Sequence, residues 1–182
     1  MNYDKEMVAN YCKMMEDYNN DYILDIFCEK IPKEASVLEL GFGTGKDYLH
    51  LKDFYNITAS DYSQEFINVF NQNYNDKVLT IDAITIEVED KFDCIYSSKV
   101  LNSLNEDQII ESFKRQYQVL NKGGYIFHTL WYGDKEEDDS FIDKQTLIKI
   151  LELDYEFVEF NYYKEADFIE SEYDSVIIIG RK

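Results

Sequence analysis

Apolar residues recur along this chain at two spacings, which predict helices and strands in alternation. Spacings of three and four predict helices, and they occur in the region 1–31 and at 46–54, 64–70, 105–120 and 144–153. Short, mostly apolar runs predict strands at 37–40, 92–97, 125–130, 155–162 and 175–180. Strands that alternate with helices are typical of an α/β protein built on a mainly parallel sheet.

The most informative stretch is the strand at 37–40 and the three glycines that follow it. Gly41, Gly43 and Gly45 are separated by single residues, and a helix is predicted directly after them. Glycine tolerates positive φ and has no Cβ, so this run allows a sharp turn and a close approach of a ligand to the backbone. A strand, a glycine turn and a helix together predict a nucleotide-binding corner.

The residues around this turn narrow the choice of nucleotide. Lys46 stands where the dinucleotide fingerprint needs its third glycine, and Leu40 and Asp47 do not fit a phosphate-binding P-loop. Glu39 lies two positions before the first glycine. A carboxylate at that place suits a ligand with positive charge or hydrogen-bond donors, and it would repel a pyrophosphate. The stretch resembles the first motif of class I S-adenosylmethionine-dependent methyltransferases.

The resemblance continues in order along residues 37 to about 130. The segments 56–63, 78–83, 91–104 and 119–127 are similar to the second to fifth strands of that family and their adjoining loops. It implies a Rossmann-like, seven-stranded, mostly parallel sheet with an antiparallel last strand and helices on both faces. It also implies S-adenosylmethionine as the cofactor.

The resemblance assigns roles to particular residues. Asp61, 22 positions after Glu39, would bind the ribose hydroxyls, and Ser63 would cap the next helix and leave Asp61 free for the ribose. Tyr62 would lie against the adenine or remain a partly exposed tyrosine. Ser97 opens a loop expected to face the sulfonium and the acceptor. The predicted cofactor-binding set is Glu39, Gly41, Gly43, Gly45, Asp61, Tyr62, Asp82, Ala83 and Ser97.

The acceptor side is predicted from the N-terminal region and from the ends of two strands. Residues 1–31 are interpreted as core-packing helices or as a lid over the cofactor. Many relatives carry a histidine where this chain has Asn102 and Ser103, so no general base is evident there and no catalytic residue is assigned. His128, within an apolar strand, is interpreted as a packed residue. The predicted substrate pocket is Tyr11, Ser98, Ser103, Trp131 and Tyr132.

Length and composition set the remaining expectations. With 182 residues, of which 45% are hydrophobic, the chain is expected to form one domain, a Rossmann-like core at 32–182 preceded by the helical region. A net charge of −19 argues against nucleic acid as a partner. The three cysteines suggest neither a disulfide framework nor a metal site. No membrane span or signal peptide is indicated, so a cytoplasmic protein, a monomer or homodimer, is expected.

The sequence is compatible with three functions. The first is methyl transfer from S-adenosylmethionine to a small-molecule acceptor, in which the protein acts mainly by positioning the reactants. The second is a protein that binds S-adenosylmethionine or S-adenosylhomocysteine without turnover. The third is an NAD-dependent oxidoreductase, which would also use Asp61 but is disfavoured by Lys46.

Overall fold

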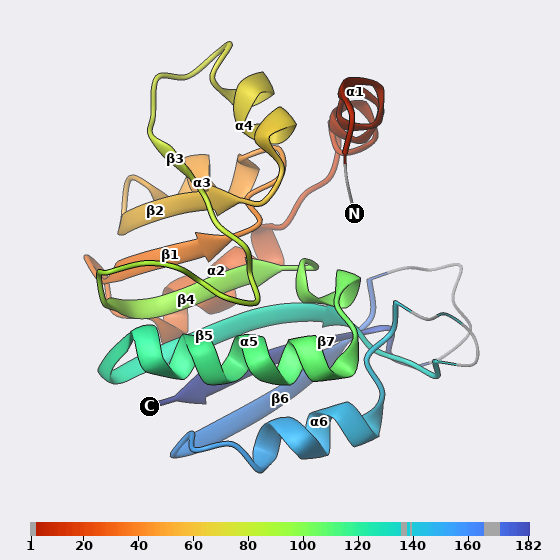
Figure 1. Cartoon of the computed structure of the whole chain (residues 1–182). Coiled ribbons are helices and arrows are strands. Elements are labelled where there is room, and N and C mark those ends of the chain that lie inside the picture. The colour runs from red at the N-terminus through yellow and green to blue at the C-terminus, as the bar shows by residue number, and fades with distance from the viewer. Residues whose placement is uncertain (1–2, 136–137, 139, 166–171) are drawn as a thin grey trace.

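The computed structural model, shown in Figure 1, describes residues 3–135, 138, 140–165 and 172–182. A seven-stranded sheet runs through it in the order β3-β2-β1-β4-β5-β7-β6. All strands are parallel except β7, which pairs in antiparallel fashion with both β5 and β6. The predicted fold class is thus confirmed. The strands are β1 (Ser36–Leu40), β2 (Asn56–Asp61), β3 (Val78–Thr80), β4 (Phe92–Ser98), β5 (Leu120–Trp131), β6 (Phe157–Tyr163) and β7 (Ser175–Arg181).

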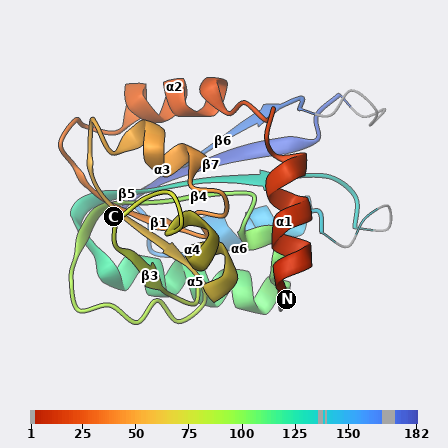
Figure 2. The same ribbon diagram turned by 90° about the horizontal axis from the view of Figure 1, so that it is seen from above.

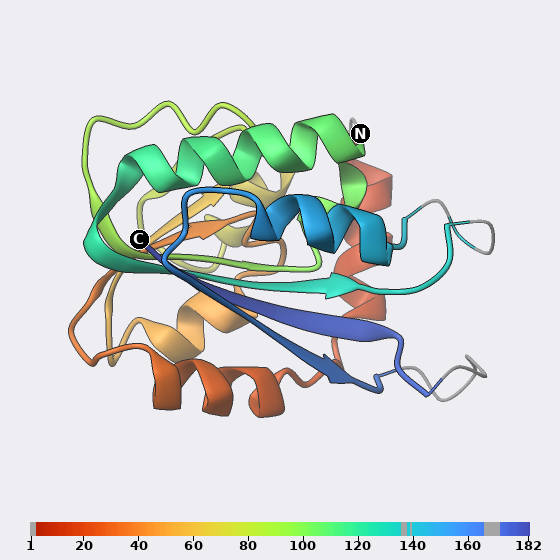
Figure 3. The same cartoon turned by 90° about the horizontal axis from the view of Figure 1, so that it is seen from below.

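Helices cover both faces of the sheet, as Figures 2 and 3 show from above and below. α2 (Asp21–Lys30) and α3 (Lys46–Leu51) lie on one face, and α5 (Glu106–Val119) and α6 (Lys144–Leu151) lie on the other. α4 (Gln64–Phe70) follows β2, and the short 3₁₀ helix η1 (Leu101–Ser103) follows β4. α1 (Lys5–Met14) lies across the end of the sheet where the parallel strands terminate. The predicted helical region is therefore two helices.

The core has two main layers, because β1 is buried on both faces. Val37 packs with Phe27 of α2 in one hydrophobic cluster, whereas Leu38 and Leu40 pack with α5 and α6 in the other. Successive side chains of a strand point to opposite faces, so Glu39 lies on the same face as Val37. A glutamate is thereby placed inside the apolar layer between the sheet and α3, which explains its burial.

Gly123 and Gly124 follow the helix predicted at 105–120, and a glycine pair at that place is expected to end the helix; this expectation is wrong. α5 ends at Val119, and β5 begins at Leu120, so both glycines lie within the strand. The register between β4 and β5 shifts between Phe92 and Cys94, and Gly123 has a φ of +77°. Glycine is needed here because an irregular stretch of strand requires a backbone conformation that other residues rarely adopt.

Phe27 connects the first core layer, and its truncation tests how that layer is held together. Its ring is fully buried and lies 5.1–5.2 Å, between ring centroids, from Tyr55, Tyr96 and Phe127. We expect Phe27→Ala to lower the free energy of unfolding by about 3–5 kcal/mol, measured by urea denaturation. Phe54→Ala, at a residue that is 47% exposed, is the matched control. Equal losses in the two variants would contradict this packing.

Candidate functional site

The glycine turn joins β1 to α3, and its three glycines serve different needs. All three have positive φ, at +69°, +53° and +77° for Gly41, Gly43 and Gly45. A Cβ on Gly41 would lie 2.6 Å from Val100, and one on Gly45 would lie 2.7 Å from Phe70. A Cβ on Gly43 would meet only the Tyr11 ring, at 3.8 Å. The turn therefore packs closely at its ends and has space at its centre.

Asp61 lies beside this turn at the carboxyl end of β2. Its Oδ2 accepts a hydrogen bond from the Gly43 N–H at 3.0 Å, and its Oδ1 accepts one from the Ser63 N–H at 2.7 Å. The expectation that the Ser63 side chain caps α4 is wrong, because that side chain makes no capping hydrogen bond. The Asp61 carboxylate instead braces the turn, and each oxygen still has a second lone pair with which to accept a ligand hydroxyl.

Glu39 is the least satisfied polar group near the turn. Its side chain is buried, and Oε2 is the one buried side-chain oxygen or nitrogen of the described residues without a hydrogen-bond partner. Burial raises the pKa of Glu39 well above its ordinary value, and the nearby carboxylates of Asp47 and Asp61 raise it further. A ligand ammonium or another donor would satisfy this oxygen. The site therefore fits a cofactor that carries a positively charged group.

Asp47 is a third carboxylate of the site, and it was not among the predicted site residues. Its Oδ2 accepts hydrogen bonds from the Tyr96 hydroxyl at 2.6 Å and from the Asn20 amide at 2.8 Å. Burial raises the pKa of Asp47, and these two hydrogen bonds oppose that rise. Asp47 thus ties the segment before α2 to the start of α3. Its position as the second residue of a helix after a glycine turn was the available signal.

The residues predicted on the adenine side lie at the ends of β2 and β3. Tyr62 is 61% exposed, so its ring is accessible to a ligand. Asp82 accepts a hydrogen bond from the Ile84 N–H at 2.7 Å, and the Ala83 carbonyl accepts one from the Ser112 hydroxyl at 2.6 Å. These contacts order the loop after β3. The adenine contacts of Tyr62, Asp82 and Ala83 remain predictions.

Ser97 and His128 form a buried pair inside the sheet. The Ser97 Oγ lies 2.8 Å from His128 Nδ1, and His128 Nε2 lies 2.7 Å from Gln116 Oε1. Burial lowers the pKa of His128 to about 3, so the ring is neutral at physiological pH. The interpretation of His128 as a packed residue is confirmed. Because the Ser97 hydroxyl has a buried partner, its predicted cofactor contact remains a prediction for its backbone alone.

The residues of the predicted substrate pocket come from several elements, and their role in a pocket remains a prediction. Ser98 and Trp131 lie at the adjoining ends of β4 and β5, and Tyr11 lies over the glycine turn with its ring 5.3 Å from that of Phe66. The Tyr132 ring packs 4.8 Å from that of Tyr162. Ser103 is exposed, and its hydroxyl donates to the Val100 carbonyl.

Asn102 has a structural role. Its Oδ1 accepts a hydrogen bond from the Trp131 N–H at 2.9 Å, and its Nδ2 donates to the carbonyls of Trp131 and Ser140. The side chain is buried. It therefore fixes the backbone at the end of β5.

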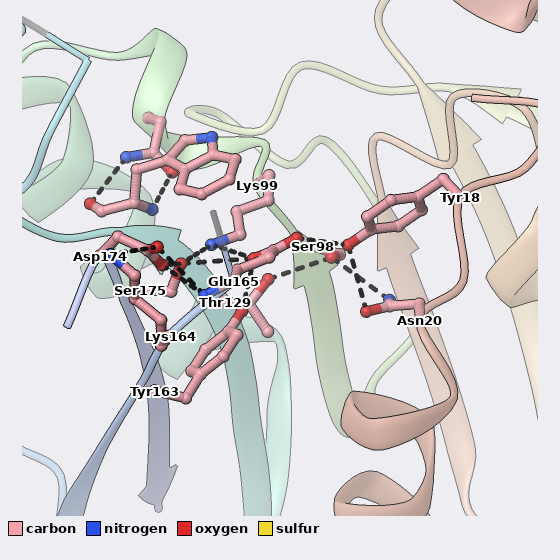
Figure 4. A network of polar contacts seen from close by, with 12 residues as sticks. Tyr18, Asn20, Ser98, Lys99, Thr129, Tyr163, Lys164, Glu165, Asp174 and Ser175 are labelled. Carbon is pink, nitrogen blue, oxygen red and sulfur yellow. Dashed lines mark hydrogen bonds and ion pairs between the residues drawn. The ribbon is translucent and has the colours of Figure 1, made fainter. Parts of the chain in front are cut away.

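Lys99 is the residue of this region that sequence reasoning missed. Its Nζ lies 3.0 Å from Glu165 Oε2, donates to Ser175 Oγ at 2.6 Å and lies 3.8 Å from the Trp131 ring centroid. Figure 4 shows these side chains converging from the end of β4, the end of β6 and the start of β7. Burial lowers the pKa of Lys99 to about 8, against the opposing effect of Glu165. A lysine directly after a buried strand was the only signal in the sequence.

Two further findings concern the described part of the chain as a whole. Within it, no three histidine, cysteine, aspartate or glutamate side chains are grouped so that they could hold a metal ion. No helix in the same residues is long and apolar enough to cross a membrane.

The fold and the site define a Rossmann-like protein with a nucleotide-binding corner, and comparisons with known proteins agree. The family model described as "Methyltransferase domain" matches residues 37–124. The probable S-adenosyl-L-methionine-dependent methyltransferase TehB of Haemophilus influenzae strain 10810 is 26% identical over 170 residues, which cover 83% of this chain and 58% of TehB. The chain thus spans less than two thirds of that relative.

Solved structures give the same fold. A possible histamine N-methyltransferase from Thermotoga maritima superposes with a TM-score of 0.76 at 18% identity, covering 98% of this chain and 97% of that one. The N-methyltransferase NodS from Bradyrhizobium japonicum, solved with S-adenosyl-L-homocysteine, gives 0.69 at 16% identity, covering 91% and 89%. In the matched family model, in its curated relatives and in its fold, this chain is therefore similar to S-adenosylmethionine-dependent methyltransferases.

The unsatisfied Glu39 carboxylate predicts a conflict between stability and binding. A carboxyl whose pKa is higher in the folded than in the unfolded protein destabilises the fold at every pH where the unfolded group is ionised. We therefore expect Glu39→Gln to raise the free energy of unfolding at pH 7 by about 1–3 kcal/mol, measured by urea denaturation.

The pH dependence provides the control for this prediction. Below about pH 4 the carboxyl is protonated in both states, so the gain from Glu39→Gln should disappear there. The same variant should bind S-adenosylmethionine more weakly at pH 7. A stabilisation that does not change with pH would show that ionisation of Glu39 is not its cause.

Proposed function

We propose that this chain transfers a methyl group from S-adenosylmethionine to a small-molecule acceptor. The observation that carries the proposal is the buried, unpartnered Oε2 of Glu39 next to a glycine turn with space at Gly43. Glu39 would accept hydrogen bonds from the cofactor's ammonium, and Asp61 would accept them from its ribose hydroxyls. The cofactor supplies a methyl group activated by a sulfonium, so the protein has chiefly to bind, orient and exclude water.

The surroundings of the acceptor side support a small acceptor. Ser98, Lys99 and Trp131 lie where β4 and β5 end, next to the glycine turn, and Val100 packs against Gly41. The Lys99 side chain is 14% exposed, so it is largely buried but not sealed from solvent. The net charge of −19 favours an acceptor that is neutral or cationic. The rings of Trp131 and Tyr163 lie near the Lys99 ammonium and would give an acceptor pocket here apolar walls.

The competing functions differ from this one in what they require. A protein that binds the cofactor without turnover would use the same turn and carboxylates, but it would not require a polar group near the place of an acceptor. An NAD-dependent oxidoreductase would need room for a pyrophosphate at the turn. Lys46, in place of the third glycine, instead extends to the backbone carbonyls of Met15, Glu16 and Tyr18.

The cofactor assignment is tested by calorimetric titration with S-adenosylmethionine, S-adenosylhomocysteine and NAD. We expect both sulfur compounds to bind with micromolar dissociation constants and NAD not to bind. Asp61→Ala should weaken both at least about tenfold, because it removes the ribose acceptor and the brace on Gly43.

Asp25→Ala, at an exposed position of α2, is the matched control and should bind like the unaltered protein. Transfer of tritium from labelled S-adenosylmethionine to a panel of small amines, thiols and hydroxyl compounds then tests turnover. Binding without any transfer would favour the non-catalytic function, and tight binding of NAD would overturn the proposal.

We further propose that the segment 1–31 acts as a lid, with Lys46 as its latch. The Lys46 Nζ donates to the carbonyls of Met15 and Glu16 at 2.6 Å each and to that of Tyr18 at 3.2 Å. These residues join α1 to α2, and Tyr11 of α1 lies over Gly43. One side chain thus connects the lid directly to the glycine turn.

Removal of this latch should accelerate exchange of the bound cofactor. We expect Lys46→Met to increase the dissociation rate of S-adenosylhomocysteine by about tenfold or more, because three charge-assisted hydrogen bonds to the lid are lost. Stopped-flow displacement measures the rate. Lys13→Met, in the last turn of α1, is the control, and equal rates in both variants would contradict the latch.

A further inference from the structure

Lys99 lies at the boundary between the cofactor corner and the predicted acceptor pocket. Its backbone is fixed on both sides: its N–H donates to the Thr129 carbonyl at 2.9 Å, and the next residue, Val100, packs against Gly41. Lys99 also has a φ of +57°, a conformation that is unfavourable for a lysine. Strained residues of this kind gather at active sites, and the ammonium of this one lies over the Trp131 ring.

The surroundings of the Lys99 ammonium come from several segments. Trp131 and Tyr163 present their rings, with centroids 3.8 Å and 5.2 Å from Nζ. Glu165 makes an ion pair with it, and Ser175 accepts its hydrogen bond. Within the part of the chain that the structure describes, the charged and titratable groups around Lys99 are Glu165, Asp174, Tyr163, Lys164 and Tyr18. Lys164 pairs with Asp174, and Tyr18 donates to Glu165.

This arrangement suits a base better than a permanent ion pair. Among the described residues, Glu165 is the carboxylate paired with Nζ, and the rings of Trp131 and Tyr163 lie where water would otherwise stabilise the charge. Glu165 is itself shared with the Tyr18 hydroxyl, at 2.8 Å from Oε1. Burial accordingly lowers the pKa of Lys99 to about 8, so a useful fraction of the amine is neutral at slightly alkaline pH.

We propose that Lys99 accepts the proton that the acceptor's nucleophilic atom loses during methyl transfer. This role rests on the proposed function. The nucleophile's lone pair forms the new bond to the methyl carbon, and the carbon–sulfur bond breaks with its electron pair remaining on sulfur. The proton passes to the neutral Nζ, and the resulting ammonium is stabilised by Glu165 and the two rings. The acceptor is therefore one whose reacting atom carries a proton, such as an amine or a hydroxyl.

The role requires Nζ to lie near the sulfonium, and this is testable before any acceptor is known. S-adenosylmethionine and S-adenosylhomocysteine differ by the methyl group and the positive charge on sulfur. A protonated Lys99 should therefore disfavour the first relative to the second. We define the ratio as the dissociation constant of S-adenosylmethionine divided by that of S-adenosylhomocysteine, both measured by calorimetry. We expect this ratio to fall on the order of tenfold between pH 6.5 and pH 9, as Lys99 loses its proton.

Three variants separate Lys99 from other titrating groups. Lys99→Met should show the low ratio at both pH values, and Lys99→Arg should show the high ratio at both, because arginine keeps its charge. Lys149→Met, which removes an exposed lysine paired with Glu106 on α5, should behave like the unaltered protein. A ratio that does not change with pH, or that changes equally in Lys99→Met, would overturn the proposal.

A second readout follows once the panel provides an acceptor. Lys99→Met should reduce kcat by about 10²–10⁴-fold and remove the rise of kcat with pH, with a smaller effect on KM. An unchanged pH profile would overturn the role even if the rate fell. Failure of both sulfur compounds to bind the unaltered protein would refute the proposed function itself, and it is recognisable because no ratio can then be formed.

Discussion

The parallel pairing of β1 with β2 on one side and β4 on the other is the constraint on which the rest of the structure depends. It aligns Leu40 with Ser60 and Glu39 with Tyr96. The strands therefore end together, and the glycine turn, the Asp61 carboxylate and the loop that begins at Lys99 meet at one edge. Ligands bind at this edge in open α/β sheets, and here the burial of β1 on both faces holds the edge rigid.

That same pairing explains why the site contains groups that weaken the fold. Alternation along β1 places Glu39 in an apolar layer, where its carboxylate has an oxygen without a partner. Two more carboxylates lie close enough to raise its pKa. The folded chain thus holds a concentration of negative charge that a cationic ligand relieves. The carboxylates that could bind a ligand thus lower the stability of the fold, as is usual for functional sites.

Much of the fold could be predicted from the sequence, because apolar periodicity reports directly on burial. The helix at 64–70 was predicted to the residue, and all seven strands were placed in the right order. The helix predicted at 105–120 ends within one residue of α5, but the strand predicted from Tyr125 begins at Leu120. This earlier start was missed because a glycine pair that ends a helix and one that lies within a strand look alike in a sequence. The difference lies in the pairing with Phe92 and Cys94, which is a tertiary property.

The candidate site also has a part that could be predicted from the sequence and a part that could not. Gly41, Gly43, Gly45, Glu39 and Asp61 form a local pattern, and the structure brings them together as expected. The role of Lys99 could not be predicted, because it depends on contacts with residues that lie far along the chain. These residues are Trp131, Tyr163, Glu165 and Ser175. The role of the Asn102 side chain could not be predicted either, because its hydrogen-bond partners lie far along the chain. Its bonds to Trp131 give it a definite role.

The hydrogen bond between Tyr18 and Glu165 spans 147 positions, and this has a consequence for synthesis on the ribosome. The turn and its carboxylates need only the strands up to β4, all within residues 36–98. The surroundings of Lys99 require β6 and β7 as well. Because chains emerge from the N-terminal end first, the glycine turn and its carboxylates are synthesised before the segments that surround Lys99.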